Sequence, residues 1–249
     1  YLYPVLADGG VGITRDWPMV PDAANDTHDH PHHKGIYTAQ GAVNGVDNWS
    51  EVEGHGYQVH QTFTRLYSGP VAGGFNEILH WTDADHQPNM TETRHLTFYN
   101  APAECRLIDY EITFEASQGP VVLGDTKEGG LIAVRVATSM DVTGDMSGGR
   151  FVNGYGAVLE DEAWGKRAPW CDYSGPTELG WRSVCLMDHQ DNPRYPTFWH
   201  VRNYGLMTAN PIALHDFTGD PNNTWDLIIP AGESLTWRYR ILVHDGDAA

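Results

Sequence analysis

The ten residues Leu107–Ala116 read Leu-Ile-Asp-Tyr-Glu-Ile-Thr-Phe-Glu-Ala, and they decide the fold class. Single polar residues separate the apolar side chains Ile108, Tyr110, Ile112 and Phe114. A period of two is typical of a strand with one buried face and one solvated face. The stretch therefore predicts a long strand that covers a hydrophobic core, as in antiparallel sheets.

The same alternation recurs away from this stretch. Near the end of the sequence, Trp237, Tyr239, Ile241 and Val243 alternate with polar residues. Further candidate strands are Tyr57–Tyr67, Phe75–Trp81, Thr93–Tyr99, Leu131–Ala137, Ala157–Glu160, Arg182–Asp188 and Trp225–Ile229. Breaks with Gly and Pro separate them, and no long pattern of period 3.6 occurs. We predict an all-β fold, a large two-sheet antiparallel β-sandwich with few short helices, as one domain over residues 1–249.

Composition excludes several classes of function. The 249 residues contain 15 Lys and Arg against 33 Asp and Glu, a net charge of −18, which argues against a nucleic-acid partner. No run approaches the roughly 18 apolar residues of a membrane span. The three cysteines, Cys105, Cys171 and Cys185, form no Cys-x-x-Cys motif, so neither a disulfide scaffold nor a thiolate zinc site is expected. Cys171 and Cys185 either pair or remain buried thiols.

Four of the 13 histidines lie in the six residues His28–His33. Neutral imidazole is a common metal ligand, and its pKa lies closest to neutrality among the side chains. In an extended chain alternate residues share a face, so His28, His30 and His32 could hold a divalent metal ion with one position left to water. His33 would then point the other way, toward a cleft. The alternative is a polar loop that bonds its own turns.

A second polar segment, Gly124–Gly130, reads Gly-Asp-Thr-Lys-Glu-Gly-Gly between two apolar runs. A hairpin turn needs only a Gly and an Asp or Asn. Here Asp125, Lys127 and Glu128 are held between glycines, where backbone can approach a ligand closely. Asp125 and Glu128 could form a proton-transfer pair, with Lys127 tuning one of them. A solvated charged turn is the alternative.

Two later segments, Ala163–Gly175 and Asp188–Pro211, combine aromatic and charged side chains. In a strand from Phe198, His200 and Arg202 share one face, which is costly to bury unless it lines a polar cavity. Aromatic rings cover the C–H surface of a sugar, and charged groups bind its hydroxyls. Core aromatics and an exposed polar face are the alternatives. The candidate substrate-binding residues are Lys127, Trp164, Trp170, Asp172, Tyr173, His189, Arg194, Arg202, Asn203, Tyr204 and Asn210.

Four motifs carry a family resemblance: residues 30–35 (HPHHKG), 124–130 (GDTKEGG), 164–175 (WGKRAPWCDYSG) and 192–211 (NPRYPTFWHVRNYGLMTANP). Through them the chain, from about Tyr3 to Asp247, resembles the bacterial DUF6807 family, which has also carried the label methane oxygenase PmoA. The methane monooxygenase subunit of that name is a membrane protein, so the label does not suit a chain without a span. The family is grouped with galactose-mutarotase-like β-sandwiches, often near carbohydrate-degradation genes. The resemblance implies a supersandwich that binds a sugar on its concave face.

The sequence departs from these relatives in two places. Mutarotases use a His acid, a Glu base and an early Asn-Arg pair, and that pattern cannot be placed in order here. The family usually has Asp-His-Pro before Asn192, where this chain has Asp188-His189-Gln190. The sugar-binding fold can therefore be shared while the chemistry differs.

These observations lead us to expect a carbohydrate-active enzyme, first of all a glycoside hydrolase. Glu128 or Asp125 would act as base or nucleophile, and His33 or His200 would protonate the leaving oxygen. His32 is the fifth candidate catalytic residue. Arg202 and Lys127 would bind hydroxyls or a carboxylate of the substrate. Trp164 and Trp170 would stack on the sugar.

Two other functions stay open. The same residues suit a sugar epimerase or polysaccharide lyase, in which a metal could assist. The third is a non-catalytic carbohydrate-binding module. No cofactor is required in any of them, and a divalent metal is the one candidate. The expected compartment is secreted or periplasmic, with the cytoplasm as alternative.

Overall fold

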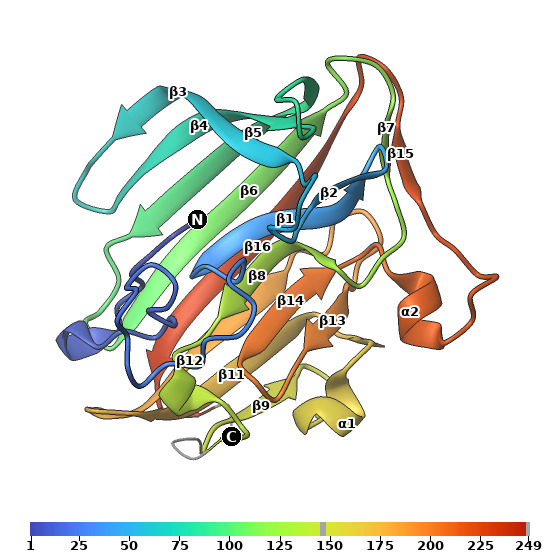
Figure 1. Ribbon diagram of the computed structural model, residues 1–249. Coiled ribbons are helices and arrows are strands. Elements are labelled where there is room, and N and C mark those ends of the chain that lie inside the picture. The colour runs from blue at the N-terminus through green and yellow to red at the C-terminus, as the bar shows by residue number, and fades with distance from the viewer. Residues whose placement is uncertain (145–147, 248–249) are drawn as a thin grey trace.

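The computed structural model describes residues 1–144 and 148–247 and confirms the antiparallel β-sandwich (Figure 1). One sheet, which we call the first sheet, has the strand order β10-β13-β14-β8-β1-β7-β15, and β2 also pairs with β1. Its strands are β1 (Ile36–Val43), β2 (Val46–Asn48), β7 (Val121–Leu123), β8 (Gly129–Arg135), β10 (Lys166–Arg167), β13 (Phe198–Val201), β14 (Leu206–Asn210) and β15 (Leu227–Ile229).

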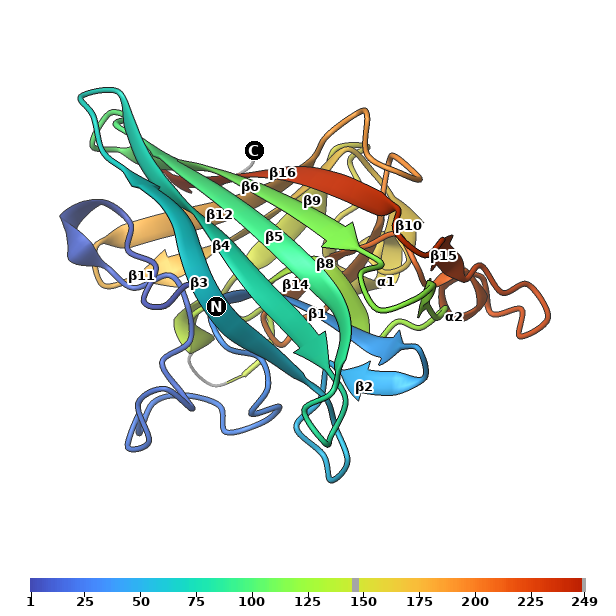
Figure 2. The ribbon, with the colours of Figure 1, turned by 90° about the horizontal axis from the view of Figure 1, so that it is seen from above.

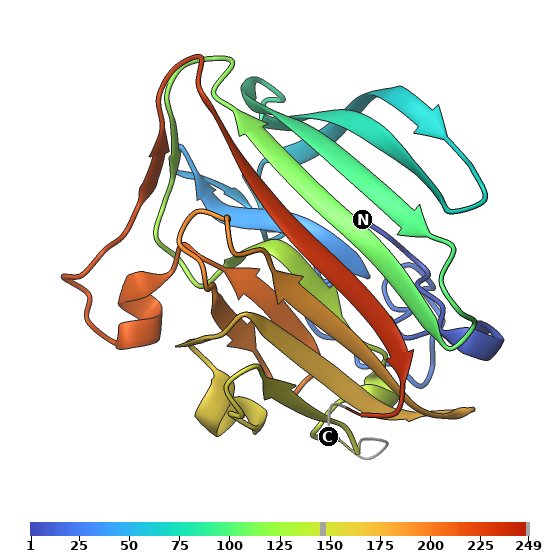
Figure 3. The same ribbon diagram turned by 180° about the vertical axis from the view of Figure 1, so that it is seen from behind.

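The second sheet has the order β3-β4-β5-β6-β16-β12-β11-β9, and its long strands lie side by side in Figure 3. The strands are β3 (Tyr57–Tyr67), β4 (Ala72–Thr82), β5 (Pro88–Tyr99), β6 (Cys105–Glu115), β9 (Arg150–Asn153), β11 (Trp170–Thr177), β12 (Gly180–Asp188) and β16 (Ser234–Asp245). Helices are short: α1 (Leu159–Ala163), α2 (Leu214–Thr218) and the 3-10 turns Asp8–Gly10 and Thr138–Met140.

The core lies between the two sheets, which cross in the view of Figure 2. All four apolar side chains of the deciding stretch are buried there, and β6 pairs with β16 along its full length. Ile36, Val134 and Met207 bring the inner face of the first sheet to the same core. The alternation in the sequence thus reports directly which side chains face inward.

Two sequence expectations need correction or completion. The predicted strand Ala157–Glu160 is wrong, because Val158 makes only an isolated bridge to Val152 and α1 begins at Leu159. The cysteines are free thiols, and Cys171 and Cys185 are both buried. Along the part of the chain that the structure describes, no helix is long and apolar enough to cross a membrane.

The first sheet has a second buried surface on the face turned away from the core, which we call its outer face. Tyr37, Ala39, Ala133 and Leu206 form a separate cluster there with Trp49. Since side chains alternate along a strand, this cluster lies opposite the core residues Ile36 and Val134. The long N-terminal coil (blue in Figure 1) brings His30, His32 and His33 into ring contact with Tyr204 and Trp49 of this face.

Candidate functional site

A row of four side chains crosses the outer face of the first sheet. Tyr37 of β1 pairs with Ala133 of β8, Ala133 pairs with Thr208 of β14, and Thr208 pairs with His200 of β13. The hydroxyl of Tyr37 and Oγ1 of Thr208 are buried, and neither has a hydrogen-bond partner among the described residues. Buried polar groups nearly always have a partner. The two hydroxyls therefore point to a place where a polar ligand binds.

His200 ends this row as a neutral imidazole with a fixed tautomer. Its side chain is buried, and Nδ1 lies 2.9 Å from the carbonyl oxygen of Lys127. A carbonyl can only accept a hydrogen bond, so Nδ1 carries the proton and Nε2 keeps its lone pair. Burial lowers the pKa of His200 to about 4. At neutral pH the ring therefore offers an acceptor at Nε2.

His33 lies on the same face and has the opposite tautomer. His33 is only 1% exposed, and its Nδ1 is 3.4 Å from Nη1 of Arg135. A guanidinium only donates, so Nδ1 accepts and the proton stays on Nε2. Burial, then the charges of His32 and Arg135, lower the pKa of His33 well below its usual range. His33 therefore offers a donor where His200 offers an acceptor.

Arg15 holds the loop that carries His33. It is fully buried, and its Nη nitrogens donate to four backbone carbonyls, those of Thr27 (3.1 Å), Asp29 (2.8 Å), His30 (2.9 Å) and His33 (3.3 Å). The carboxylate of Asp29 bridges Arg15 at 2.5 Å and Arg135 at 2.9 Å. His30 has φ +44°, a left-handed conformation that few residues adopt. This network fixes a backbone that the sequence would not adopt alone.

Glu128 directly precedes β8, beside Lys127, with which it forms an ion pair. Its side chain is 48% exposed. Burial is the first cause of the shifted pKa of four groups on this face, and the charge of Glu128 acts on all four: His32, Tyr37, His200 and Tyr204. Glu128 is therefore an accessible carboxylate whose charge acts on His32 and His200.

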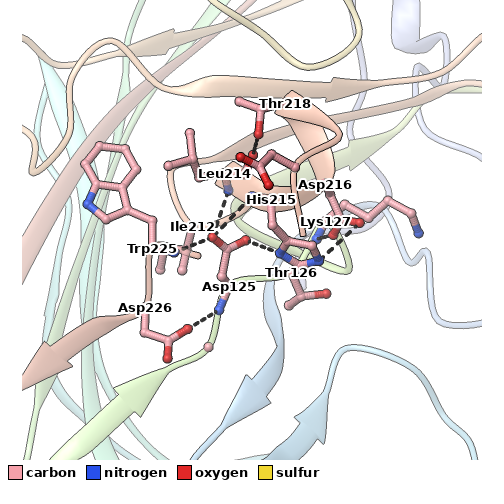
Figure 4. Close-up of polar contacts among 12 residues, drawn as sticks. Asp125, Thr126, Lys127, Ile212, Leu214, His215, Asp216, Thr218, Trp225 and Asp226 are labelled. Carbon is pink, nitrogen blue, oxygen red and sulfur yellow. Dashed lines mark hydrogen bonds and ion pairs between the residues drawn. The ribbon is translucent and has the colours of Figure 1, made fainter. Parts of the chain in front are cut away.

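Asp125 has a different role from Glu128. Its carboxylate is 1% exposed and accepts from Nδ1 of His215 (2.7 Å) and from the backbone N–H groups of Leu214 (3.0 Å), His215 (3.4 Å) and Trp225 (2.6 Å) (Figure 4). A base or nucleophile needs a free lone pair on the substrate side. This arrangement favours a structural role, in which Asp125 ties the loop before β8 to α2.

Other predicted residues frame the outer face. Tyr204 stacks on His30 at 5.0 Å, and the guanidinium of Arg202 lies 5.6 Å from the Tyr204 ring. Trp164 meets the edge of His200 at 6.4 Å. Asn210 donates to the carbonyl of Thr126 at 2.9 Å and so holds the loop under Glu128. The backbone N–H of Asn203 donates to Glu160, next to the contact of Arg202 with the same carboxylate.

The structure does not bring five predicted residues to this face. Trp170, Asp172 and Tyr173 belong to β11 of the second sheet, where Asp172 pairs with His244 at 2.9 Å. The hydroxyl of Tyr173 donates a hydrogen bond to the carbonyl of Arg202 at 3.1 Å, from the core side of the first sheet. His189 follows β12 of the second sheet and is largely exposed. Arg194 donates to backbone carbonyls of Pro211, Trp225 and Asp226.

The predicted metal set is not gathered. The chain around His28, His30 and His32 is irregular coil with a turn at Pro31 and His32 rather than a strand, so only His30 and His32 come together, with ring centroids 5.8 Å apart. His28 stacks on Trp17 and its Nε2 contacts the carbonyl of Ala23, while His30 stacks between His33 and Tyr204. Within residues 1–144 and 148–247, no three His, Cys, Asp or Glu side chains are arranged to hold a metal ion.

Comparison with known proteins adds the family. A model of DUF6807, described as a family of unknown function, matches residues 1–249. The chain belongs to the DUF6807 family. Among solved structures, this DUF6807 protein is similar to a GalM/aldose epimerase homologue from C. elegans, at 10% identity and a TM-score of 0.32 over 75% of this chain and 70% of that one. So distant a likeness says nothing about activity. No curated protein matches the sequence.

Sequence reasoning missed four residues of the candidate site: Arg15, Tyr37, Arg135 and Thr208. Arg135 ends the apolar run of β8, and a lone Arg there is the one signal that could have marked it. Tyr37 and Thr208 stand in strands that are buried on both faces, where alternation gives no sign.

Proposed function

We propose that this protein is a carbohydrate-active enzyme that moves protons on a bound sugar, as an epimerase or a lyase does. The observation that carries the proposal is the pair of neutral imidazoles of opposite tautomer, His33 and His200, on one buried face. Tyr37, in ring contact with His33, and Thr208, paired with His200, carry hydroxyls without partners among the described residues, and a sugar is rich in groups that both donate and accept hydrogen bonds.

The geometry supports a simple division of labour. Nε2 of His200 and the carboxylate of Glu128 are the proton acceptors, and either can take a proton from carbon beside a carbonyl. Nε2–H of His33 donates to the oxygen on which negative charge develops. A proton delivered to the other side of the carbon by the second of these two groups gives an epimer. Loss of an oxygen substituent on the next carbon, protonated as it leaves by the group that took the proton, gives an unsaturated sugar.

Glycoside hydrolysis, our first expectation, fits less well. It commonly uses two carboxylates, one on each side of the bond. Of the predicted pair, Glu128 is accessible, but Asp125 is saturated with donors from α2 and from Trp225. A neutral His33 donates a hydrogen bond but is a poor source of a full proton. These two points favour proton transfer at carbon.

An isotope experiment tests the proposal. The protein is incubated in D2O with panels of aldoses, uronates and neutral oligosaccharides, and products are followed by NMR and by ultraviolet absorbance. We expect deuterium on carbon, with or without an absorbing double bond. New reducing ends without carbon-bound deuterium would instead establish hydrolysis. Binding without any reaction would establish the carbohydrate-binding module.

Variants connect the result to the site. His200→Gln and Glu128→Gln should each lower the rate of exchange at least 100-fold, the lower range of general acid–base catalysis. His189→Gln is the matched control, because His189 is exposed beside the second sheet. Equal activity of the His200 and His189 variants would refute the assigned role.

A further inference from the structure

A cavity of about 260 Å³ opens beside the site, where the edge of β1 and β2 meets the second sheet. Among its lining residues are His32, Tyr37, Asn48, Trp49, Gln58 and Arg94. At the roughly 30 Å³ that a water molecule occupies in the liquid, it holds about nine waters, which is room for one sugar ring.

The walls of this cavity carry polar groups without partners. The hydroxyl of Tyr37 and Oδ1 of Asn48 are buried, and neither finds a hydrogen-bond partner in the described residues. Nδ2 of Asn48 already donates to the carbonyl of Thr82 at 3.0 Å, which fixes the amide so that its oxygen stays available. A ligand that donates to these two oxygens would complete them.

Arg94 supplies donors on the second-sheet side. Its Nε donates to Glu92 at 2.7 Å, and Glu92 in turn accepts from Nε1 of Trp81 at 2.7 Å. Both members of the pair are buried. Because Nε is used, the Nη nitrogens are what Arg94 offers to the cavity, and the planar guanidinium is held in place.

Charge indicates which ligand fits. Arg94 is balanced by Glu92, and Lys34 is balanced by Glu51. Burial lowers the pKa of His32, which keeps that ring neutral. A cavity whose Arg and Lys side chains are each paired with a carboxylate, and that has many hydrogen-bonding groups, suits a neutral hydroxylated ring better than a carboxylated one.

The cavity adjoins the candidate site, since Tyr37 belongs to both. From β1 to β13 the row crosses three strand spacings, about 14 Å at roughly 4.8 Å each. One sugar ring cannot touch both His200 and Asn48 across that span. We propose that the cavity is a second sugar-binding subsite for a neutral ring, so that the substrate is an oligosaccharide; this rests on the proposed function of the site.

Binding calorimetry on the full chain tests the subsite. The probes are cello-, xylo- and manno-oligosaccharides of one to four units. In the series that binds, we expect affinity to rise at least tenfold between one unit and the length that reaches the cavity, then to level off. Equal affinity at every length would overturn the proposal, and so would no binding by any series at millimolar concentration.

Two variants assign the gain to the cavity. Arg94→Lys keeps a positive charge against Glu92 but loses the guanidinium fork, and Gln58→Ala removes the amide of a half-buried side chain that also donates to the carbonyl of Asn48 at 2.9 Å. Each should lose about tenfold in affinity for the longer oligosaccharide and little for the monosaccharide, whereas Arg238→Lys on the second sheet should change neither. Equal losses at every length would show a structural effect and overturn the assignment.

These results separate the two proposals. A length dependence that needs Arg94, without deuterium exchange, keeps the subsite and refutes the enzyme. Deuterium exchange with affinity that is independent of length keeps the enzyme and refutes the subsite.

Discussion

Replacing Arg15 by Ala tests how the histidine loop is held. The substitution removes the donors of four loop carbonyls and one of the two guanidinium contacts of Asp29. Breaking a buried charged network costs about 3–5 kcal/mol, and here the loss falls mainly on the four carbonyls, because Asp29 is 37% exposed and keeps its contact with Arg135. For a domain of this size each kcal/mol lowers the melting temperature by about 2–4 °C. We therefore expect Arg15→Ala to melt about 6–20 °C lower.

The matched control is Arg238→Ala. Arg238 pairs with Glu111 at 2.7 Å, but both side chains are substantially exposed. Such surface pairs contribute about 0.2–1 kcal/mol, so a shift of at most a few degrees is expected. Urea unfolding and thermal melts, monitored by tryptophan fluorescence and circular dichroism, measure both variants. If the two variants lose the same stability, Arg15 is not the anchor that the geometry indicates.

Three further perturbations have outcomes set by the same contacts. Burial lowers the pKa of His200 from 6.5 to about 4, so the stability that the neutral ring contributes is present above pH 6.5 and is lost as the pH falls toward 4. At 1.36 kcal/mol per pKa unit, this contribution is about 3 kcal/mol. His200→Gln should therefore flatten that part of the pH–stability curve in urea titrations. Asp125→Asn should lower the free energy of unfolding by about 1–3 kcal/mol, since it disturbs a buried acceptor of four hydrogen bonds; lost exchange activity at unchanged stability would instead make Asp125 catalytic. Tyr37→Phe should raise stability by about 1 kcal/mol or leave it unchanged in thermal melts, because the hydroxyl has no partner to lose, and a clear loss would show a hidden bond.

Strands could be predicted from the sequence where one face of the strand is solvated. β6 and β16 show this, because their inward residues alternate with polar ones along both strands. β1, β8 and β14 were harder, since residues of both faces are buried and the alternation disappears. β11 was interpreted as an aromatic binding segment, although its Cys171 and Tyr173 face the core.

Part of the candidate site could be predicted from the sequence, because some of its residues stand in conspicuous polar segments. His33, Glu128 and His200 stand in segments of unusual polar density, which the sequence displays. Tyr37 and Thr208 acquire meaning only through cross-strand register with Ala133, and register is a property of the folded sheet. Asp172 shows the converse. It stands in a polar motif that the sequence marks as a candidate site, but it lies on the second sheet and pairs there with His244.

The two buried arginines connect the architecture of the site to its protonation. The pKa of His33 is lowered first by burial and then by the charges of His32, Arg135 and others, with Arg15 among them. A protonated His33 would present an N–H to the guanidinium of Arg135 in place of a lone pair, so ionisation would break the contact at 3.4 Å. The cluster that holds the loop in place therefore also keeps His33 neutral, with its proton on Nε2. The net charge of −18 would by long-range attraction favour a protonated imidazole. The local positive charge of the two arginines opposes this, so that His33 remains a neutral donor on the same face as the acceptor His200. Loss of Arg15 should accordingly raise the pKa of His33 while it loosens the loop, and an NMR titration of the imidazole signals in the variant would reveal both effects together.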